Sequence, residues 1–407
     1  MNAKSITKFL IETLPAALAF SLFIYLEEMG VANRAITAAA GVYALYRLLQ
    51  FSPKAMAASG FFIGLLWFYW IGLSFRYVEM AWAVLPVMIG VASVIALLFW
   101  VLGWVRPVWA RAAVMLLYFD WVTPFGFAWL KPELLFVNSF LGTAKWQMAL
   151  ILAVIVAFIY LKERSRYAPV LFILLLPAWN PVPPTEPLEK GIVLSGTDYT
   201  QEQKWNPANT PFIVDTQLER IAQAAEAGNR LIILPESVFP LYLNYYPDLI
   251  HELKVLSRKI TIVTGGLYRD TTGHYNSTYF FDNGEMTVAH KVVLVPFGET
   301  TDFLPERLGK MVNAIFFESA EDYTTAVKPT DFMIGGEKWR SAICYEATVE
   351  RMYADAPGKM IAISNNAWYK PSTEPALQRV LIRYFSRKYG VRVYHVVNGS
   401  PSEVIGN

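Results

Sequence analysis

The sequence predicts a polytopic α-helical membrane domain followed by an α/β domain. Hydrophobic residues make up 55% of the 407 residues and charged residues only 17%, an apolar content above that of ordinary water-soluble chains. The excess lies in residues 9–179, where long apolar stretches are separated by short charged loops. From Pro181 onward, short β-rich runs alternate with helical stretches, which is typical of a layered α/β domain.

The amino-terminal part contains about seven candidate membrane spans. A span needs roughly 20 apolar residues. Five segments meet this requirement well, namely residues 9–26, 35–49, 57–75, 82–105 and 146–161. Two others are less regular: residues 112–130 carry Asp120 and Pro124, so we expect a broken or re-entrant segment, and residues 167–179 are short for a full crossing.

The charges of the loops predict the orientation of these spans. One alternating set of loops is rich in bases, namely Lys4, Lys8, Arg47, Lys54, Arg106, Arg111, Lys162, Arg164 and Arg166. The opposite set is poorer in bases, with Arg34, Arg76, Lys131 and Lys145. Because short cytoplasmic loops are enriched in Lys and Arg, we expect a cytoplasmic amino terminus and an α/β domain on the outer face. Residues 9–26 also fit a cleaved signal, but no small-residue cleavage site follows them, so we expect an uncleaved anchor.

The expected domain boundaries follow the change in composition. They are 1–180 for the transmembrane domain, 181–190 for a linker and 191–407 for the α/β domain. The stretch PAWNPVPPTEPLEK is rich in proline, which suits an extended linker better than a helix. The net charge of +2 provides no strong electrostatic case for binding nucleic acid.

The α/β part is expected to contain eight strands and three helices. The strands are GIVLSG, RLIILPE, ITIVTGGLY, STYFFD, KVVLVP, SAICYE, KMIAISNN and VRVYHVV, and the helices cover residues 215–227, 249–257 and 374–389. Polar residues interrupt the apolar runs at three strand ends: Glu236, Lys291 and Cys344, the only cysteine of the chain. Strand ends are where α/β folds place their chemistry.

These three residues carry a resemblance to a known superfamily. Glu236 in LPES, Lys291 in HKVVLVPFGE and Cys344 in ICYE resemble the Glu-Lys-Cys triad of the nitrilase (carbon-nitrogen hydrolase) superfamily, in the same order. Together with the multi-span amino-terminal half, the chain is similar to the apolipoprotein N-acyltransferase family over nearly its whole length. The resemblance implies an αββα sandwich on the periplasmic face of a bacterial inner membrane.

The residues also make chemical sense together. A thiol with a pKa of about 8.5 is mostly protonated at neutral pH, so a nucleophilic Cys344 needs a nearby base or cation. Glu236 would be the base. Attack on an acyl carbonyl builds negative charge on oxygen, which Lys291 and a backbone N–H near Tyr345 would stabilise, leaving a thioester on Cys344. The alternative for each residue is structural: a helix-terminal carboxylate, a solvated charge and a buried small side chain.

The resemblance implies further site residues outside the triad. Glu299 in PFGE and Glu346 in CYE would be supporting carboxylates, although either could instead form a structural ion pair. Trp205 in QKWN and Trp368 in SNNAWY would line the acyl pocket, or pack as ordinary aromatic core residues.

The histidines, a glycosylation tripeptide and the basic face of one helix have ordinary explanations. The four histidines show no metal-ligand spacing, so we expect no metal and no other cofactor. The tripeptide NST at Asn276 fits the glycosylation pattern, which we take as chance in a bacterial protein. Arg379, Arg383 and Arg387 lie on the basic face of the helix over residues 374–389, which we expect to be solvated or to touch anionic lipid headgroups.

The acceptor stays open at this point. The resemblance implies a phospholipid acyl donor and the amine of a lipoprotein as acceptor. The sequence departs from the family pattern at Asn366, where Asp is usual, in the run after CYE, and at its end at Asn407, and this shorter form resembles TraB-type conjugal-transfer proteins. That alternative predicts acyl or peptidyl transfer onto a pilin amine, including cyclisation. A non-catalytic membrane scaffold and simple amide hydrolysis are the further alternatives.

Overall fold

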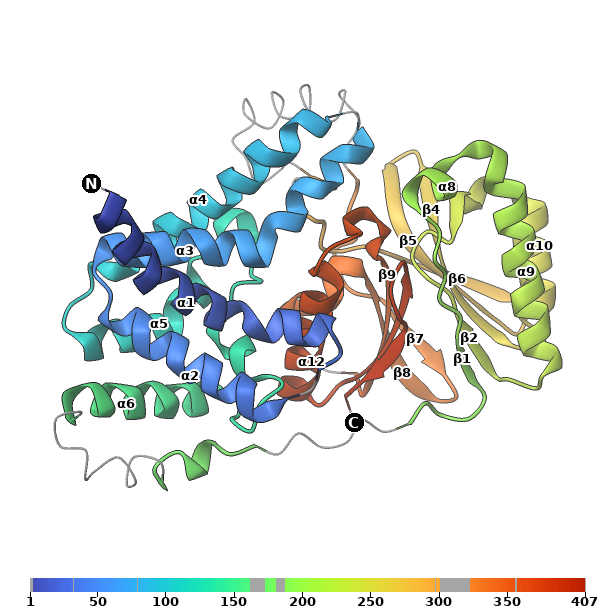
Figure 1. The fold of residues 1–407 in the computed structure, drawn as a ribbon. Helices are drawn as coiled ribbons and strands as arrows, with labels where there is room; N and C mark the ends of the chain where they lie inside the picture. Colours follow the sequence, from blue (N-terminus) through green and yellow to red (C-terminus); the bar gives the residue numbers. More distant parts are fainter. Residues whose placement is uncertain are drawn as a thin grey trace. The chain divides into compact units, whose positions relative to one another are not determined.

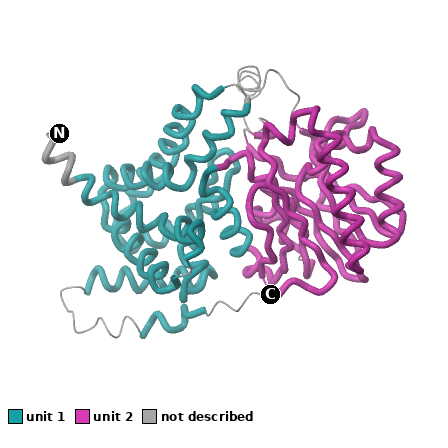
Figure 2. Tube along the Cα trace, turned by 45° about the vertical axis from the view of Figure 1, so that its right-hand side comes forward, with its two compact units in different colours: residues 1–183, 371–384 teal, residues 184–370, 385–407 magenta. Residues whose placement is uncertain are grey.

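The computed structural model divides the chain into two compact units (Figure 2). It describes residues 3–31, 33–78, 80–161, 173–180, 187–296, 298–300, 323–355 and 357–406. Unit 1 contains Met1–Pro183 and Pro371–Tyr384, and unit 2 contains Pro184–Lys370 and Phe385–Asn407. The expected linker, residues 181–190, lies partly outside the described residues, and its boundaries stay a prediction.

Unit 1 is helical in its described residues (Figure 1). The α-helices are α1 (Ala3–Glu28), α2 (Arg34–Gln50), α3 (Pro53–Phe68), α4 (Val84–Gly103), α5 (Val108–Trp121) and α6 (Lys145–Leu161). Short 3₁₀ helices lie between and after them: η1 (Tyr69–Val78), η2 (Ala81–Ala83), η3 (Pro124–Gly126), η4 (Pro132–Phe136) and η6 (Leu176–Ala178).

Helices α3 and α4 pack closely because α3 presents glycines to α4. A Cβ atom on Gly64 would lie 2.7 Å from the Cα atom of Ala92, and one on Gly60 would lie 2.7 Å from Cβ of Phe99. Small residues at helix contacts are typical of membrane bundles, where close backbone approach replaces the hydrophobic effect between helices. Ser52 caps the amino end of α3 by accepting a hydrogen bond from the Ala55 N–H.

Three helical stretches in the described part of the chain are long and apolar enough to cross a membrane: Phe9–Glu28, Pro53–Tyr77 and Ala81–Gly103. Helices α2 and α6 are apolar but have 17 residues each. Helix α5 ends at Trp121, and Phe125 has a φ of 57°, so residues 112–130 form a broken segment, as expected. Residues 162–172, with their three bases, lie outside the described residues, so the count of seven spans stays a prediction.

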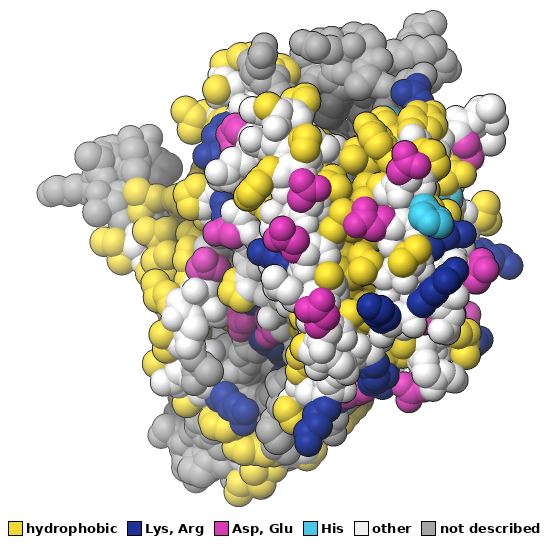
Figure 3. All heavy atoms as spheres, turned by 90° about the vertical axis from the view of Figure 1, so that its right-hand side faces the viewer, with side chains coloured by type: hydrophobic (Ala, Val, Ile, Leu, Met, Phe, Trp, Pro, Cys, Tyr) yellow, Lys and Arg dark blue, Asp and Glu magenta, His cyan; other side chains and the backbone are white. Residues whose placement is uncertain are grey.

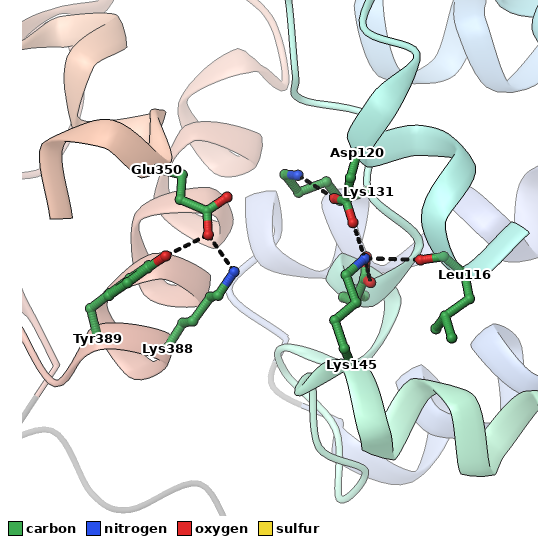
Figure 4. Close-up of polar contacts among 8 residues, drawn as sticks. Leu116, Asp120, Lys131, Lys145, Glu350, Lys388 and Tyr389 are labelled. Carbon is green, nitrogen blue, oxygen red and sulfur yellow. Dashed lines mark hydrogen bonds and ion pairs between the residues drawn. The ribbon is translucent and has the colours of Figure 1, made fainter. Parts of the chain in front are cut away.

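The break after α5 is accompanied by a cluster of charged side chains (Figure 4). The carboxylate of Asp120 accepts a hydrogen bond from Lys131, 2.8 Å away, and pairs with Lys145. Lys145 also pairs with Glu133, which is 1% exposed, and donates to the Leu116 carbonyl. The residue that interrupts the predicted span is therefore neutralised by two lysines.

Helix α12 (Glu374–Tyr389) corrects the prediction for its basic face. Arg383 donates to Glu27 at 2.9 Å and to the amide oxygen of Asn138 at 2.8 Å, and Arg379 lies 3.4 Å from Glu27. The three charged side chains are only 13–19% exposed. A solvated or lipid-facing role is therefore wrong for Arg379 and Arg383, because the carboxylate at the end of α1 pairs with both.

Unit 2 contains two β-sheets. The first has the order β1-β2-β4-β5-β6, with β3 paired to β4, and the second has the order β11-β10-β9-β8-β7. The strands of the first sheet are β1 (Ile192–Leu194), β2 (Leu231–Ile233), β3 (Phe239–Tyr242), β4 (Thr261–Asp270), β5 (Gly273–Asp282) and β6 (Glu285–His290). Those of the second are β7 (Asp331–Ile334), β8 (Glu337–Ile343), β9 (Lys359–Asn365), β10 (Arg392–Asn398) and β11 (Glu403–Ile405).

The two sheets and their helices form the expected layers. One apolar core contains side chains from both sheets, such as Val263 of β4, Ile343 of β8 and Ile361 of β9. A second core joins the first sheet to α9 (Thr210–Glu226) and α10 (Pro247–Leu256). Seen from the side of these helices, basic and acidic side chains are interspersed on the surface (Figure 3). The predicted fold class, a helical apolar region followed by an α/β domain, is confirmed.

One predicted strand is wrong. KVVLVP does not pair as a strand; β6 instead covers Glu285–His290 and ends just before Lys291. The physical reason is that the N–H groups of Val292 and Val293 donate to the carboxylate of Glu346 and not to a neighbouring strand. The hairpin from β5 to β6 turns at Asn283 and Gly284, whose φ angles of 50° and 86° suit the Asn-Gly pair.

Candidate active site

The three predicted catalytic residues all belong to unit 2 and follow strands. Glu236 follows β2, Lys291 follows β6 and Cys344 follows β8. Glu236 is 8% exposed, Lys291 is 1% exposed, and Cys344 is half-buried and packs at the edge of the core between the sheets. The charges of Glu236 and Cys344 both act on Lys291, so the fold brings the three side chains into one electrostatic neighbourhood.

The backbone is strained at Cys344 and directly after Glu236. Cys344 has a φ of 53° at the junction of β8 and the 3₁₀ helix η9 (Cys344–Thr348), and Ser237, next to Glu236, has a φ of 45°. Residues other than Gly rarely adopt this left-handed backbone conformation, and such strain concentrates at functional sites. The turn at Glu236 also needs Gly265 of β4, because a Cβ there would lie 2.3 Å from the Ser237 nitrogen.

Glu299 lies where the resemblance implied a supporting carboxylate. Its two oxygens lie 2.9 Å and 2.7 Å from Nζ of Lys291, and one of them accepts the Val295 N–H at 2.9 Å. Burial lowers the pKa of Lys291, but the carboxylates of Glu299 and Glu236 outweigh it and hold this pKa above its ordinary value. Lys291 is therefore an ammonium at neutral pH, despite being buried.

Glu346 joins the segments that carry Lys291 and Cys344. One carboxylate oxygen accepts the N–H groups of Val292 at 2.6 Å and Val293 at 3.0 Å, and the other accepts the Ile343 N–H at 2.8 Å. Burial raises the pKa of Glu346 to about 7, although Lys291 and the three N–H groups favour the ionised form. Tyr345, the other predicted supporting residue, stands between Cys344 and Glu346 in the chain and is 5% exposed.

The structure adds Asn276 of β5 to the site. Its side-chain nitrogen donates to Glu236 at 2.7 Å and to Glu299 at 3.3 Å, and its carbonyl accepts the Lys291 N–H at 3.0 Å. One amide therefore holds the proposed base and the carboxylate that pairs with Lys291. The sequence analysis did not choose Asn276, because the tripeptide NST was considered only as a glycosylation pattern. The feature that could have indicated a site residue is a polar side chain directly before the predicted strand STYFFD.

Lys204 is the second residue that sequence reasoning missed. It lies in the short helix α8 (Gln201–Trp205), is 1% exposed, and donates from Nζ to the Glu236 carbonyl at 2.8 Å. Burial lowers the pKa of Lys204 to about 8, against the opposing influence of Glu236 and Cys344. The available signal was a lysine in the segment QKWN, whose tryptophan alone was chosen.

The two predicted substrate residues lie on short helices. Trp205 is 37% exposed at the end of α8, and its indole N–H donates to Gln201 at 2.9 Å. Trp368 is half-buried in η11 (Asn366–Tyr369), directly after β9. Trp205 is thus not a core residue, and the role of both in binding substrate stays a prediction. Within the described ranges, no group of three His, Cys, Asp or Glu side chains is placed to hold a metal ion.

Two known domain families match consecutive parts of the chain. Residues 7–179 match the apolipoprotein N-acyltransferase integral membrane domain, and residues 200–395 match carbon-nitrogen hydrolase. The apolar helical part and the layered α/β part therefore define a membrane protein of the carbon-nitrogen hydrolase class.

The particular family follows from full-length relatives. A protein named apolipoprotein N-acyltransferase from Wolinella succinogenes is 39% identical over 96% of this chain and 94% of its own length. Proteins of the same name from Helicobacter hepaticus and Helicobacter pylori are 35% and 34% identical over 90% and 87% of this chain, and 92% and 84% of their own lengths. The chain belongs to the apolipoprotein N-acyltransferase family.

Proposed function

We propose that this protein transfers a fatty-acyl group from a phospholipid to the amine of a lipoprotein, through a thioester on Cys344. The observation that carries the proposal is the position of the chain's only cysteine, at a strained strand end where its charge acts on a buried ammonium, in a chain that matches this family along nearly its whole length. The family name supplies the acceptor, and the membrane domain supplies access to the lipid donor.

In the first half-reaction, Glu236 takes the thiol proton and the thiolate of Cys344 attacks the ester carbonyl carbon of the phospholipid. The ester C–O bond breaks, and the departing lysophospholipid oxygen takes the proton from Glu236. Asn276 occupies one oxygen of Glu236, whereas the other oxygen is buried and has no hydrogen-bond partner among the described residues, so it is available for this proton.

The negative charge that develops on the carbonyl oxygen needs fixed positive partners. Lys291 is held by Glu299 and remains charged, and the backbone N–H near Tyr345 is the proposed second donor. In the second half-reaction the acceptor amine attacks the thioester carbonyl, loses its proton to Glu236, and releases the Cys344 thiolate with formation of an amide. The same two donors serve both tetrahedral intermediates.

Trp205 and Trp368 are proposed to contact the acyl chain. The exposed third of Trp205, next to the buried Lys204, supports this role, because an aromatic surface beside a catalytic centre suits an apolar substrate. No metal or other cofactor is needed for these steps.

A covalent adduct tests the proposal. Full-length protein in detergent, incubated with phospholipid and no acceptor, is expected to gain a fatty-acyl mass that hydroxylamine removes, and Cys344→Ala is expected to lose it while keeping its melting temperature. Lys291→Ala and Glu236→Gln should slow adduct formation by orders of magnitude, and the double variant should be little slower than the slower single one.

Other outcomes separate the alternatives. A peptide adduct formed with a pilin substrate would support the conjugal-transfer reaction instead. Full lipoprotein acylation by Cys344→Ala would contradict every thioester mechanism, and a wild-type protein that never carries an adduct would favour a scaffold.

A further inference from the structure

Lys204 is a buried cation that the proposed mechanism leaves without a role. Removing an ammonium from water costs several kcal/mol even after relaxation, so a fully buried lysine needs compensating partners. The hydrogen bond from its Nζ goes to a backbone carbonyl, Glu236 and Cys344 act on it through their charge, and Nζ lies 5.7 Å from the centre of the Trp205 ring. A stabilising core residue at this position would be apolar.

The carbonyl that Lys204 contacts belongs to Glu236 itself. The next residue, Ser237, has a φ of 45°, so the peptide turns sharply where the proposed base is attached. Two backbone bonds precede the turn: the Leu234 N–H donates to Val263 and the Gly265 N–H donates to Pro235. The hydrogen bond from Lys204 fixes the next carbonyl, that of Glu236. Lys204 lies in helix α8, whose amino end is capped by Thr200.

The charges of the site explain why a cation is used for this contact. Glu236 and Cys344 share one negative charge, because passing the thiol proton to Glu236 moves that charge from the carboxylate to the thiolate, and Glu299 carries a second negative charge next to Lys291. Lys291 balances one of them. Lys204 balances the other, whereas without it the ionised site carries an excess negative charge in a buried environment. Glu346 is the further carboxylate near Lys291, and its three backbone N–H donors stabilise its own charge.

The following inference rests on the proposed function. We propose that Lys204 is a positioning residue of the acyl-transfer site. Its ammonium holds the turn that carries Glu236 and supplies the second positive charge that ionised Cys344 requires. Helix α8 therefore belongs to the reaction centre as well as to the surface that carries Trp205. The lysine does not touch the acyl group.

The test uses the reactivity of the single thiol. Alkylation of Cys344 by iodoacetamide in the full-length protein is specific because the chain has no other cysteine. Lys204→Gln keeps a hydrogen-bond donor and removes the charge, and Lys204→Met removes both. We expect both variants to be alkylated about tenfold more slowly at pH 7, with the pH profile displaced upward by about one unit. Lys204→Gln should keep a melting temperature closer to that of the wild type.

The kinetic expectation is specific to positioning. Both variants should lower kcat for acyl transfer with little change in KM for the phospholipid, since Lys204 does not contact the donor. Lys259→Met, at an exposed lysine before β4, is the control for loss of one positive charge and should change neither measurement.

Two results would overturn the proposal. One is an alkylation profile for Lys204→Gln identical to that of the wild type, and the other is loss of the folded state in Lys204→Gln as well as Lys204→Met, which would make the lysine purely structural. Alkylation needs neither donor nor acceptor. A wild-type protein that fails to form the acyl adduct would therefore refute the proposed function without deciding the role of Lys204.

Discussion

At the scale of single residues, Glu346 holds the backbone on both sides of the candidate site. Its carboxylate accepts three backbone N–H groups, two from the segment after Lys291 and one from the last residue of β8. Those bonds replace strand pairing for Val292 and Val293 and fix the backbone on both sides of the candidate site. Asn276 has a comparable position, since one amide contacts both Glu236 and Glu299.

Glu346 is expected to make stability depend on pH. Burial raises the pKa of Glu346 from 4.5 to about 7, so the folded state binds this proton more tightly than the unfolded state does. Its contribution to the free energy of unfolding is fully present below pH 4.5 and is lost as the pH rises through 7. The melting temperature of wild type relative to Glu346→Gln should therefore be highest near pH 5 and decrease toward pH 8.

Glu350 is the matched control for this experiment. It lies four residues later, is 47% exposed, and contacts Lys388 and Tyr389 (Figure 4). Glu350→Gln should alter the melting temperature only slightly, because exposed ion pairs contribute about 0–1 kcal/mol. A constant difference between wild type and Glu346→Gln from pH 5 to pH 8 would contradict a raised pKa.

At the scale of elements, Arg111 joins the ends of two helices in unit 1. The sequence counts it among the bases of one set of loops, and the structure shows that it is only 5% exposed. Its guanidinium donates to the carbonyls of Leu49 at 3.0 Å and Phe51 at 2.7 Å, near the end of α2, and to that of Gly103 at 2.7 Å, at the end of α4. It thus satisfies carbonyls that helix ends leave without partners.

Replacing Arg111 should destabilise unit 1 more than a surface change would. Arg111→Ala leaves several buried carbonyls unsatisfied, at a cost of about 1–3 kcal/mol for each. We expect a loss of many degrees in melting temperature in detergent, and only partial recovery in Arg111→Lys, which lacks the planar set of donors. Arg106→Ala, at an exposed base of the same loop, is the control. Equal losses at both positions would show that Arg111 acts only through its charge.

At the scale of the whole molecule, the chain returns to its first unit near its end. Residues Pro371–Tyr384, which include the amino-terminal part of α12, cluster with unit 1, and Phe385–Asn407 belong to unit 2. Contacts that tie this segment to unit 1 include the pairing of Glu27 with Arg379 and Arg383 and the hydrogen bond from the Thr373 N–H to the Tyr69 hydroxyl. The change in composition along the sequence predicts two consecutive domains, and it therefore does not predict that residues 371–384 belong to unit 1.

The orientation of the protein in the membrane is a prediction at the same scale. The excess of Lys and Arg in one alternating set of loops predicts a cytoplasmic amino terminus and a periplasmic α/β domain in a bacterial inner membrane. Alkaline phosphatase, which is active only in the periplasm, should therefore be active when fused after Lys190. The same reporter fused after Gln50 should be inactive. Inactivity of both fusions would mean that the number of crossings before Lys190 is wrong by one, and activity after Gln50 with inactivity after Lys190 would mean that the orientation is inverted.

Much of the architecture and of the candidate site followed from local patterns. Apolar stretches of span length and β-rich runs are read from neighbouring residues, and the burial of a strand predicts where its chemistry-bearing end lies. For this reason the sequence alone determined the two-part architecture and the positions of Glu236 and Cys344 after strands, whereas Lys291 follows β6 and not the predicted strand KVVLVP. Glu299 and Glu346 were implied by the family resemblance, and their roles in the reaction stay predictions.

Only the tertiary structure decided which polar groups are partners. Lys204 and Glu236 are 32 residues apart, Asn276 and Glu236 are 40 apart, and Arg383 and Glu27 are 356 apart. KVVLVP has the composition of a strand, yet the carboxylate of Glu346, 54 residues after Val292, takes its N–H groups. Periodicity reports which face of an element is buried, but a hydrogen bond between distant residues depends on where the packing of the whole chain places both groups.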